Sequence, residues 1–179
     1  MREFIRANAN YLADGLTIFR FFISTLIFYH ACRFSSLGRI TPLVIAGLGS
    51  DVFDGMLARK FGGTSLGGLD YPADLVFVGS ISAYLVRSGF VALLWMVGWT
   101  LGLLALAAVF RNDSPVAFWM GSAYGLFILD AYFHHMPSFK AMLVTLGLII
   151  LVNPARAAYK VRSFLKDFWR GLRGEVEKD

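Results

Sequence analysis

Charged residues are scarce in this sequence. Asp, Glu, Lys and Arg make up 16% of the 179 residues, whereas a soluble domain carries about a quarter. Hydrophobic residues make up 57%, and they gather in runs of roughly twenty, the length that spans a bilayer. This composition excludes an ordinary soluble domain and predicts an integral membrane protein.

Cysteine is almost absent. Cys32 is the only one, so the chain cannot form an internal disulfide. Internal repeats and low-complexity segments are also missing, and we therefore predict a single membrane domain over residues 1–179. At its ends, residues 1–11 are expected to form an interfacial segment and residues 153–179 a basic amphipathic tail on anionic lipid.

Six apolar segments predict an all-α, polytopic membrane fold with six transmembrane helices. They cover approximately residues 12–31, 41–61, 66–86, 90–110, 116–133 and 139–152. Thr41-Pro42 is expected to begin the second helix, because proline is tolerated in the first turn.

Positive charge is distributed unevenly along this pattern. Twelve of the 17 Lys and Arg residues fall on one side of the six predicted spans and four on the other, with Arg20 inside the first. The positive-inside rule therefore places both termini, and the 59–66 connection, in the cytoplasm. The net charge of +5 indicates an anionic membrane surface as partner, and no nucleic acid.

Four aspartates interrupt the apolar pattern. Asp51 and Asp54 are three positions apart and Asp70 and Asp74 four apart, so each pair shares a helix face. The glycine-rich segment 62–68 lets the two helices fold back on each other and bring the pairs together. Carboxylates within a bilayer are costly, and hard oxygen ligands suit Mg²⁺ or Mn²⁺. A divalent-metal site is predicted; snorkelling or helix-capping aspartates are the alternative.

Small residues flank the first aspartate pair. Gly47 and Gly49 are explained equally well by close helix packing and by function. Gly55 directly follows Asp54 and indicates a large ligand lying against the backbone. Arg59 is expected to meet a phosphate or to serve as a membrane-surface anchor.

Residues 51–59 read DVFDGMLAR and residues 70–74 read DYPAD. This arrangement resembles the signature of the CDP-alcohol phosphatidyltransferase family, D-x2-D-G-x2-A-R-x7–8-G-x3-D-x3-D. The chain departs from it between Gly67 and Asp70, where two residues stand instead of three. Residues 16–20, LTIFR, are similar to the family's N-x-L-T-x-x-R opening, with Asp14 where asparagine is usual.

The resemblance implies transfer of a phosphatidyl group from CDP-diacylglycerol to an alcohol, with release of CMP, in phospholipid biosynthesis. It implies two Mg²⁺ or Mn²⁺ ions and a homodimer. The implied metal ligands are Asp51, Asp54, Asp70 and Asp74, with Asp74 also the general base. The implied CDP-binding residues are Gly55, Ala58 and Arg59, and more weakly Thr17 and Arg20.

The acceptor is inferred from three cations on the predicted cytoplasmic side. Arg111, Arg156 and Lys160 would suit an alcohol that carries its own phosphate, such as glycerol 3-phosphate or inositol phosphate. The alternative is that they only anchor the helix ends. The same motif also serves enzymes that use CDP-choline or CDP-ethanolamine and diacylglycerol.

Two further alternatives lie outside this chemistry. The acidic cluster could be a divalent-cation transport site, although transporters usually show internal repeats and helices broken at the midplane. The short spacing before Asp70 would suit a non-catalytic family member. A second polar group, Asp130 with His134 and His135, lies near the opposite face and suits a water-exposed helix end better than a metal site.

Overall fold

The computed structural model describes residues 9–61, 69–110, 114–152, 154 and 162. Within these residues the chain is all helical and contains no strand, which confirms the predicted all-α class. The helices are α2 (Ala9–Cys32), α3 (Leu37–Phe61), α4 (Asp70–Arg87), α5 (Leu93–Phe110), α6 (Ser114–His134) and α7 (Met136–Val152). Each predicted apolar segment corresponds to one of them. The predicted interfacial segment and basic tail lie almost entirely outside the described residues.

The start of α3 differs from the prediction. The helix begins at Leu37, so Pro42 lies inside it instead of in its first turn. Leu37 and Ile40 are buried in the main core, which stabilises the additional turn. Thr41 Oγ1 also donates to the Leu37 carbonyl oxygen at 2.8 Å. Tertiary packing therefore outweighs the single backbone hydrogen bond that proline removes.

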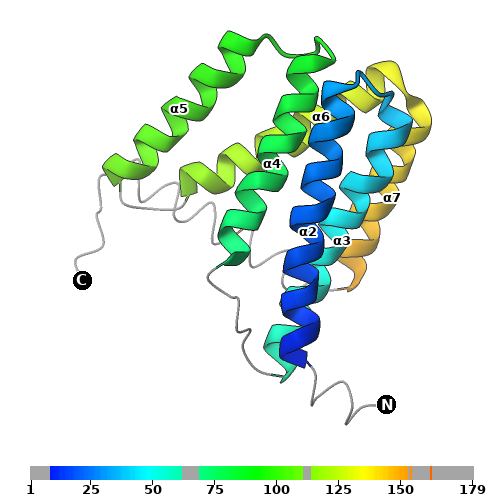
Figure 1. Cartoon of the computed structure of the whole chain (residues 1–179), viewed down its shortest axis with the longest axis vertical. Coiled ribbons are helices and arrows are strands. Elements are labelled where there is room, and N and C mark those ends of the chain that lie inside the picture. The colour runs from blue at the N-terminus through cyan, green and yellow to red at the C-terminus, as the bar shows by residue number, and fades with distance from the viewer. Residues whose placement is uncertain (1–8, 62–68, 111–113, 153, 155–161, 163–179) are drawn as a thin grey trace.

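The helices run alternately up and down the bundle (Figure 1). The α2–α3, α4–α5 and α6–α7 junctions lie at one end, and the remaining helix ends point the other way. Helix α2 packs against both α3 and α4. Helix α6 contacts α4, α5 and α7, and α7 closes against α3. Helix α5 leans away from the α2–α3–α4 group.

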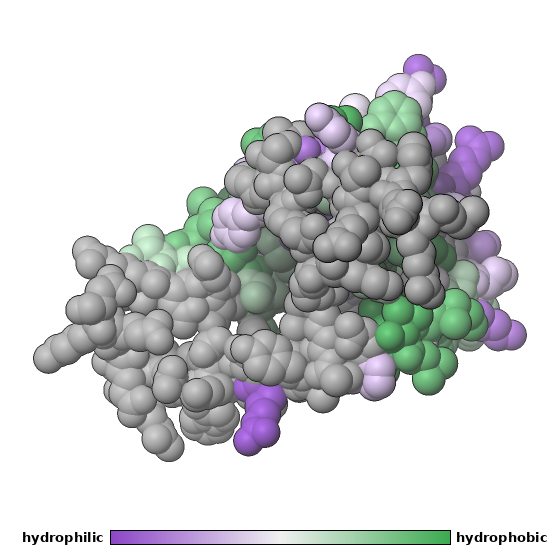
Figure 2. All heavy atoms as spheres, turned by 90° about the horizontal axis from the view of Figure 1, so that it is seen from below, coloured by the Kyte–Doolittle hydropathy of each residue, from purple (hydrophilic) through white to green (hydrophobic). Residues whose placement is uncertain are grey.

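Three segments of the described helices are long and apolar enough to cross a membrane: Tyr11–Cys32, Leu37–Leu57 and Pro115–His134. Two shorter apolar segments, Leu93–Ala108 and Met136–Val152, accompany them. Many large hydrophobic side chains are exposed on these helices, and they form apolar areas on the flanks of the molecule in the end view of Figure 2. Such a surface is typical of a membrane protein.

One aromatic ring of α4 lies against α3 one turn before the first aspartate. A Cβ atom at Gly47 would overlap the ring of Phe77, which is itself buried in the core. At Gly49 a Cβ would meet nothing within 4 Å. Gly47 therefore leaves room for the Phe77 ring of α4 against the backbone of α3, whereas Gly49 has no such role.

Candidate functional site

Helix α2 turns polar residues inward. Four buried polar side chains follow one another at spacings of three or four positions, which places them on one face: Asp14, Thr17, Arg20 and Ser24. The opposite face is apolar and exposed, with Tyr11, Ile18 and Phe22 at the same level. The helix is thus polar inside and apolar outside, the pattern of a helix that supports a polar site in lipid.

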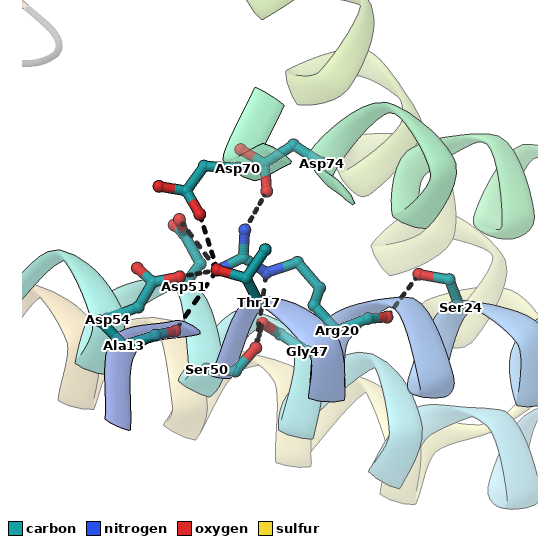
Figure 3. A network of polar contacts seen from close by, with 10 residues as sticks. All are labelled: Ala13, Thr17, Arg20, Ser24, Gly47, Ser50, Asp51, Asp54, Asp70 and Asp74. Carbon is teal, nitrogen blue, oxygen red and sulfur yellow. Dashed lines mark hydrogen bonds and ion pairs between the residues drawn. The ribbon is translucent and has the colours of Figure 1, made fainter. Parts of the chain in front are cut away.

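Arg20 is the centre of the site (Figure 3). Its side chain is 1% exposed. Its Nη1 donates to Asp74 Oδ1 at 2.5 Å, and its Nη2 donates to Asp54 Oδ2. Nη2 also lies 3.6 Å from Asp51 Oδ1. One guanidinium from α2 therefore pairs with carboxylates from both α3 and α4.

Thr17 completes the connection between α2 and the four aspartates. It lies one turn before Arg20, and its hydroxyl donates to Asp70 Oδ1 at 2.6 Å. The two sequence pairs that we predicted to converge are brought together in this way, with Thr17 and Arg20 between them (Figure 3).

Two serines support Arg20, and our sequence reasoning missed both. Ser50 Oγ accepts from Arg20 Nε at 3.5 Å and donates to the Gly47 carbonyl at 2.8 Å. Ser24 Oγ donates to the Arg20 backbone carbonyl at 2.7 Å. Their positions carried a signal, because Ser50 adjoins Asp51 and Ser24 continues the polar face of α2.

The carboxylates differ in their access to solvent or ligand. The side chain of Asp54 is 10% exposed, that of Asp74 is 33% exposed and that of Asp51 is 45% exposed. A ligand would therefore reach the site from the side of Asp51 and Asp74. If all four aspartates are ionised, Arg20 balances only one of their charges, so this side attracts cations.

Chemically, this donor set suits a hard divalent cation, since carboxylate oxygens from two helices converge on one positive centre. In the arrangement seen here they face the Arg20 guanidinium. Among the described residues, no three or more Asp, Glu, His or Cys side chains form a group placed to hold a metal ion. The four carboxylates are chemically suitable ligands for a divalent cation, but the Arg20 guanidinium lies at the centre of the group they form.

The other predicted site residues are only partly visible. Gly55 is half-buried in α3, next to Asp54. Ala58 and Arg59 lie in the last turns of α3, but their side chains are outside the described part of the chain. The acceptor candidates Arg111, Arg156 and Lys160 lie outside the described residues. So does Gly67, at which the chain departs from the spacing of the family motif.

The second polar group separates into two parts. Asp130 Oδ1 lies 2.7 Å from His134 Nδ1, whereas His135 Nδ1 lies 2.7 Å from Ser138 Oγ at the start of α7. The His134 side chain is exposed. This group sits at the C-terminal end of α6, away from the motif aspartates.

Comparison with protein-family models matches residues 10–165 to CDP-alcohol phosphatidyltransferase. The match covers most of the chain and includes the polar face of α2 and all four aspartates. Comparisons with curated proteins and with solved structures gave no significant match. The matched length, together with the motif carried by α3 and α4, shows that this chain belongs to the CDP-alcohol phosphatidyltransferase family, a family of membrane transferases of phospholipid biosynthesis.

Proposed function

We propose that this protein transfers a phosphatidyl group from CDP-diacylglycerol to a hydroxyl of a small phosphorylated polyol, of the glycerol 3-phosphate or inositol phosphate type, and releases CMP. One observation carries the proposal. The four motif carboxylates of α3 and α4 converge on the buried polar face of α2, inside a bundle whose buried residues are mainly apolar. A charged centre of this kind within a membrane protein indicates function.

The proposed ligands of the family's divalent metals, two Mg²⁺ or Mn²⁺ ions, are Asp51, Asp54, Asp70 and Asp74. Such ions, when bound, neutralise a pyrophosphate and stabilise the leaving nucleotide. Support comes from the chemistry of the donor set and from its unbalanced negative charge. The greater exposure of Asp51 and Asp74 gives a side from which ions and substrates can enter.

Asp74 is the proposed general base. Its carboxylate takes the proton of the acceptor hydroxyl, whose oxygen then forms a bond to the β-phosphorus of CDP-diacylglycerol. The bond from that phosphorus to the bridging oxygen breaks, and CMP leaves with this oxygen. Asp74 suits the role because its side chain is 33% exposed, so an acceptor hydroxyl can reach its carboxylate.

The remaining proposed contacts rest on the family resemblance and on the predicted cytoplasmic placement of three basic residues. Gly55 lets the CDP group approach the backbone of α3 beside Asp54, and Ala58, Arg59, Thr17 and Arg20 border the same group. Arg111, Arg156 and Lys160 are proposed to bind the acceptor phosphate, because basic side chains recognise phosphate through charge-assisted hydrogen bonds.

We further propose that all six helices cross the inner (cytoplasmic) membrane, with both termini and the aspartate site facing the cytoplasm, and that the protein forms a homodimer. The alternating direction of the helices supports the first part (Figure 1). The uneven distribution of Lys and Arg supports the orientation. The homodimer rests on family resemblance.

The test is a screen of donors and acceptors with the purified protein, in Mg²⁺ or Mn²⁺, following CMP release. We expect CMP from CDP-diacylglycerol only when a polyol acceptor, best a phosphorylated one, is added. CMP released only from CDP-choline or CDP-ethanolamine with diacylglycerol would replace the proposal with that reaction. If folded protein releases no CMP from any pair, the phosphotransfer proposal fails. In that case Mn²⁺ flux into liposomes would identify transport, and its absence a non-catalytic family member.

A further inference from the structure

We propose that Arg20 is an internal counter-ion of the aspartate site, which takes the place of the divalent cation and must release the carboxylates when that cation binds. The proposal rests on the metal-binding part of the proposed function. It adds a role to Arg20, a positioning residue that acts through Asp54 and Asp74.

The contacts of Arg20 are those of a bound cation. All three of its nitrogen atoms point at oxygen atoms of α3 and α4: Nη1 at Asp74, Nη2 at Asp54 and Asp51, and Nε at Ser50. The guanidinium and Asp54 are both buried, so water weakens this pair less than it would on a protein surface, whereas Asp51 and Asp74 are partly open to solvent. Its backbone is held as well, through the hydrogen bond from Ser24.

A divalent ion would need some of the same oxygen atoms. Two cations a few ångströms apart repel strongly where water is excluded. The guanidinium and a metal ion would therefore compete for the oxygen atoms of Asp51, Asp54 and Asp74. Without either cation, the aspartates of two adjacent helices would repel each other inside an apolar bundle, which is unfavourable. Arg20 thus allows the bundle to form before metal arrives.

Once the Arg20 guanidinium is released from the carboxylates, it can bind another anion. A guanidinium binds carboxylate and phosphate oxygens in the same two-pronged manner. With the carboxylates bound to metal, the pyrophosphate of a CDP-linked lipid would be an equivalent acceptor for this guanidinium. The Arg20 guanidinium would then serve the donor, in agreement with its proposed place beside CDP.

The test measures Mn²⁺ binding in the absence of nucleotide, by electron paramagnetic resonance of free Mn²⁺, with the full chain in detergent or nanodiscs. We compare the unmodified protein with Arg20→Gln, Arg20→Lys and the control Arg33→Gln. Arg33 follows the end of α2 and lies over the ring of Tyr29, at 5.2 Å from its centroid. Arg33→Gln therefore removes the same charge without touching the aspartates.

Arg20→Gln is expected to bind Mn²⁺ about tenfold tighter or more, the factor that corresponds to losing one charge-assisted hydrogen bond that competes with the metal. Its melting temperature should fall in EDTA and recover in saturating Mn²⁺. The Mn²⁺ affinity of Arg20→Lys, which keeps one compact donor group, should lie between those of the unmodified protein and Arg20→Gln. The affinity of Arg33→Gln should match that of the unmodified protein. A merely structural Arg20 would lower the melting temperature equally with and without metal.

The outcomes separate this inference from the proposed function. If the unmodified protein binds Mn²⁺ and Arg20→Gln binds it equally or more weakly, the counter-ion role is wrong and the metal site stands. If Arg20→Gln does not fold even with Mn²⁺, Arg20→Lys is compared with the unmodified protein instead. The inference is then overturned if Arg20→Lys binds Mn²⁺ no more tightly than the unmodified protein. If no variant binds Mn²⁺, the metal site and the counter-ion role both fail.

Discussion

Helices α2 and α5 are both largely apolar, yet they are built in opposite ways. Helix α2 buries a row of polar side chains, of which Thr17 and Arg20 bind residues of α3 and α4, and exposes hydrophobic ones. Helix α5 contains no charged residue, and its side chains Leu94 and Trp95 are 86% and 74% exposed. It rests mainly on α6, and leans away from the site (Figure 1).

The contrast follows from the solvent. Apolar side chains gain little by leaving lipid tails for a protein interior, so hydrophobicity does not decide which helix lies in the centre. Polar groups do decide it, because each needs a partner that lipid does not supply. The inward polar face of α2 therefore both orders the bundle and forms the site, whereas α5 can lie at the edge.

Loss of the central cation should have the largest effect on stability. Arg20→Leu leaves the buried carboxylate of Asp54 and the partly exposed carboxylate of Asp74 without their partner, and breaking a buried ion pair typically costs about 3–5 kcal/mol. Trp95→Leu on α5 is the matched substitution and should change the free energy of unfolding by less than about 0.5 kcal/mol. Unfolding in detergent without metal, followed by circular dichroism, measures both. Equal losses would remove the distinction between the two helices.

The contact between the Phe77 ring of α4 and Gly47 of α3 should give the next largest effect on stability. Gly47→Ala places a Cβ against the buried ring of Phe77, and overpacking of this kind costs about 1–3 kcal/mol. Gly49→Ala, on the same helix, meets nothing within 4 Å and should be neutral or slightly stabilising, since alanine favours helix over glycine. Thermal unfolding of the pair tests this, and a Gly47→Ala variant as stable as Gly49→Ala would contradict the packing.

Thr17 and Thr25 provide a comparison within α2. Thr17→Val removes the hydroxyl that binds Asp70 at 2.6 Å, at a cost of about 0.5–1.5 kcal/mol, and should reduce CMP release because Asp70 loses its orientation. Thr25 binds only the Phe21 carbonyl, on the exposed side, so Thr25→Val should leave CMP release unchanged. Thr17→Ser should restore activity. Equal rates of CMP release in Thr17→Val and Thr25→Val would show that the Thr17 hydroxyl does not orient Asp70 for the reaction.

The smallest effect is expected at the edge of the bundle. Trp99 Nε1 on α5 donates to Ser122 Oγ on α6 at 3.0 Å. Trp99→Phe removes this hydrogen bond and should cost about 0.6 kcal/mol, the typical value between membrane helices. Ser122→Ala and the double variant complete a thermodynamic cycle in unfolding measurements. A coupling larger than the loss in Thr17→Val would mean that α5 is fixed more firmly than its exposure indicates.

The sequence predicted what lies within single helices and much less of what lies between them. The spacing of Asp51 with Asp54 and of Asp70 with Asp74 indicates a shared face within each helix, and the structure brings the two pairs together. Helix α3 nevertheless begins at Leu37 because core contacts, which no local pattern encodes, override the signal of Pro42.

Arg20 illustrates the same limit within the site. The similarity of residues 16–20 to a family motif assigned it to CDP, but its partners lie 34 and 54 positions further along the chain. Helical periodicity shows which residues share a face of one helix, but it does not predict contacts between residues so far apart in the sequence. Ser50 adjoins Asp51 in the sequence, but its contact with Arg20 spans 30 positions and was missed for the same reason.

The most direct test of the central claim is CMP release by the unmodified protein, Asp74→Asn and Asp130→Asn, with CDP-diacylglycerol, a phosphorylated polyol and Mg²⁺ or Mn²⁺. Asp130 is a buried carboxylate at the other end of the bundle, and thus a matched control. We expect CMP release by the unmodified protein and by folded Asp130→Asn, and a loss of about 10²–10⁴-fold in Asp74→Asn. Turnover that survives in Asp74→Asn at the unmodified rate would contradict the assignment of the site.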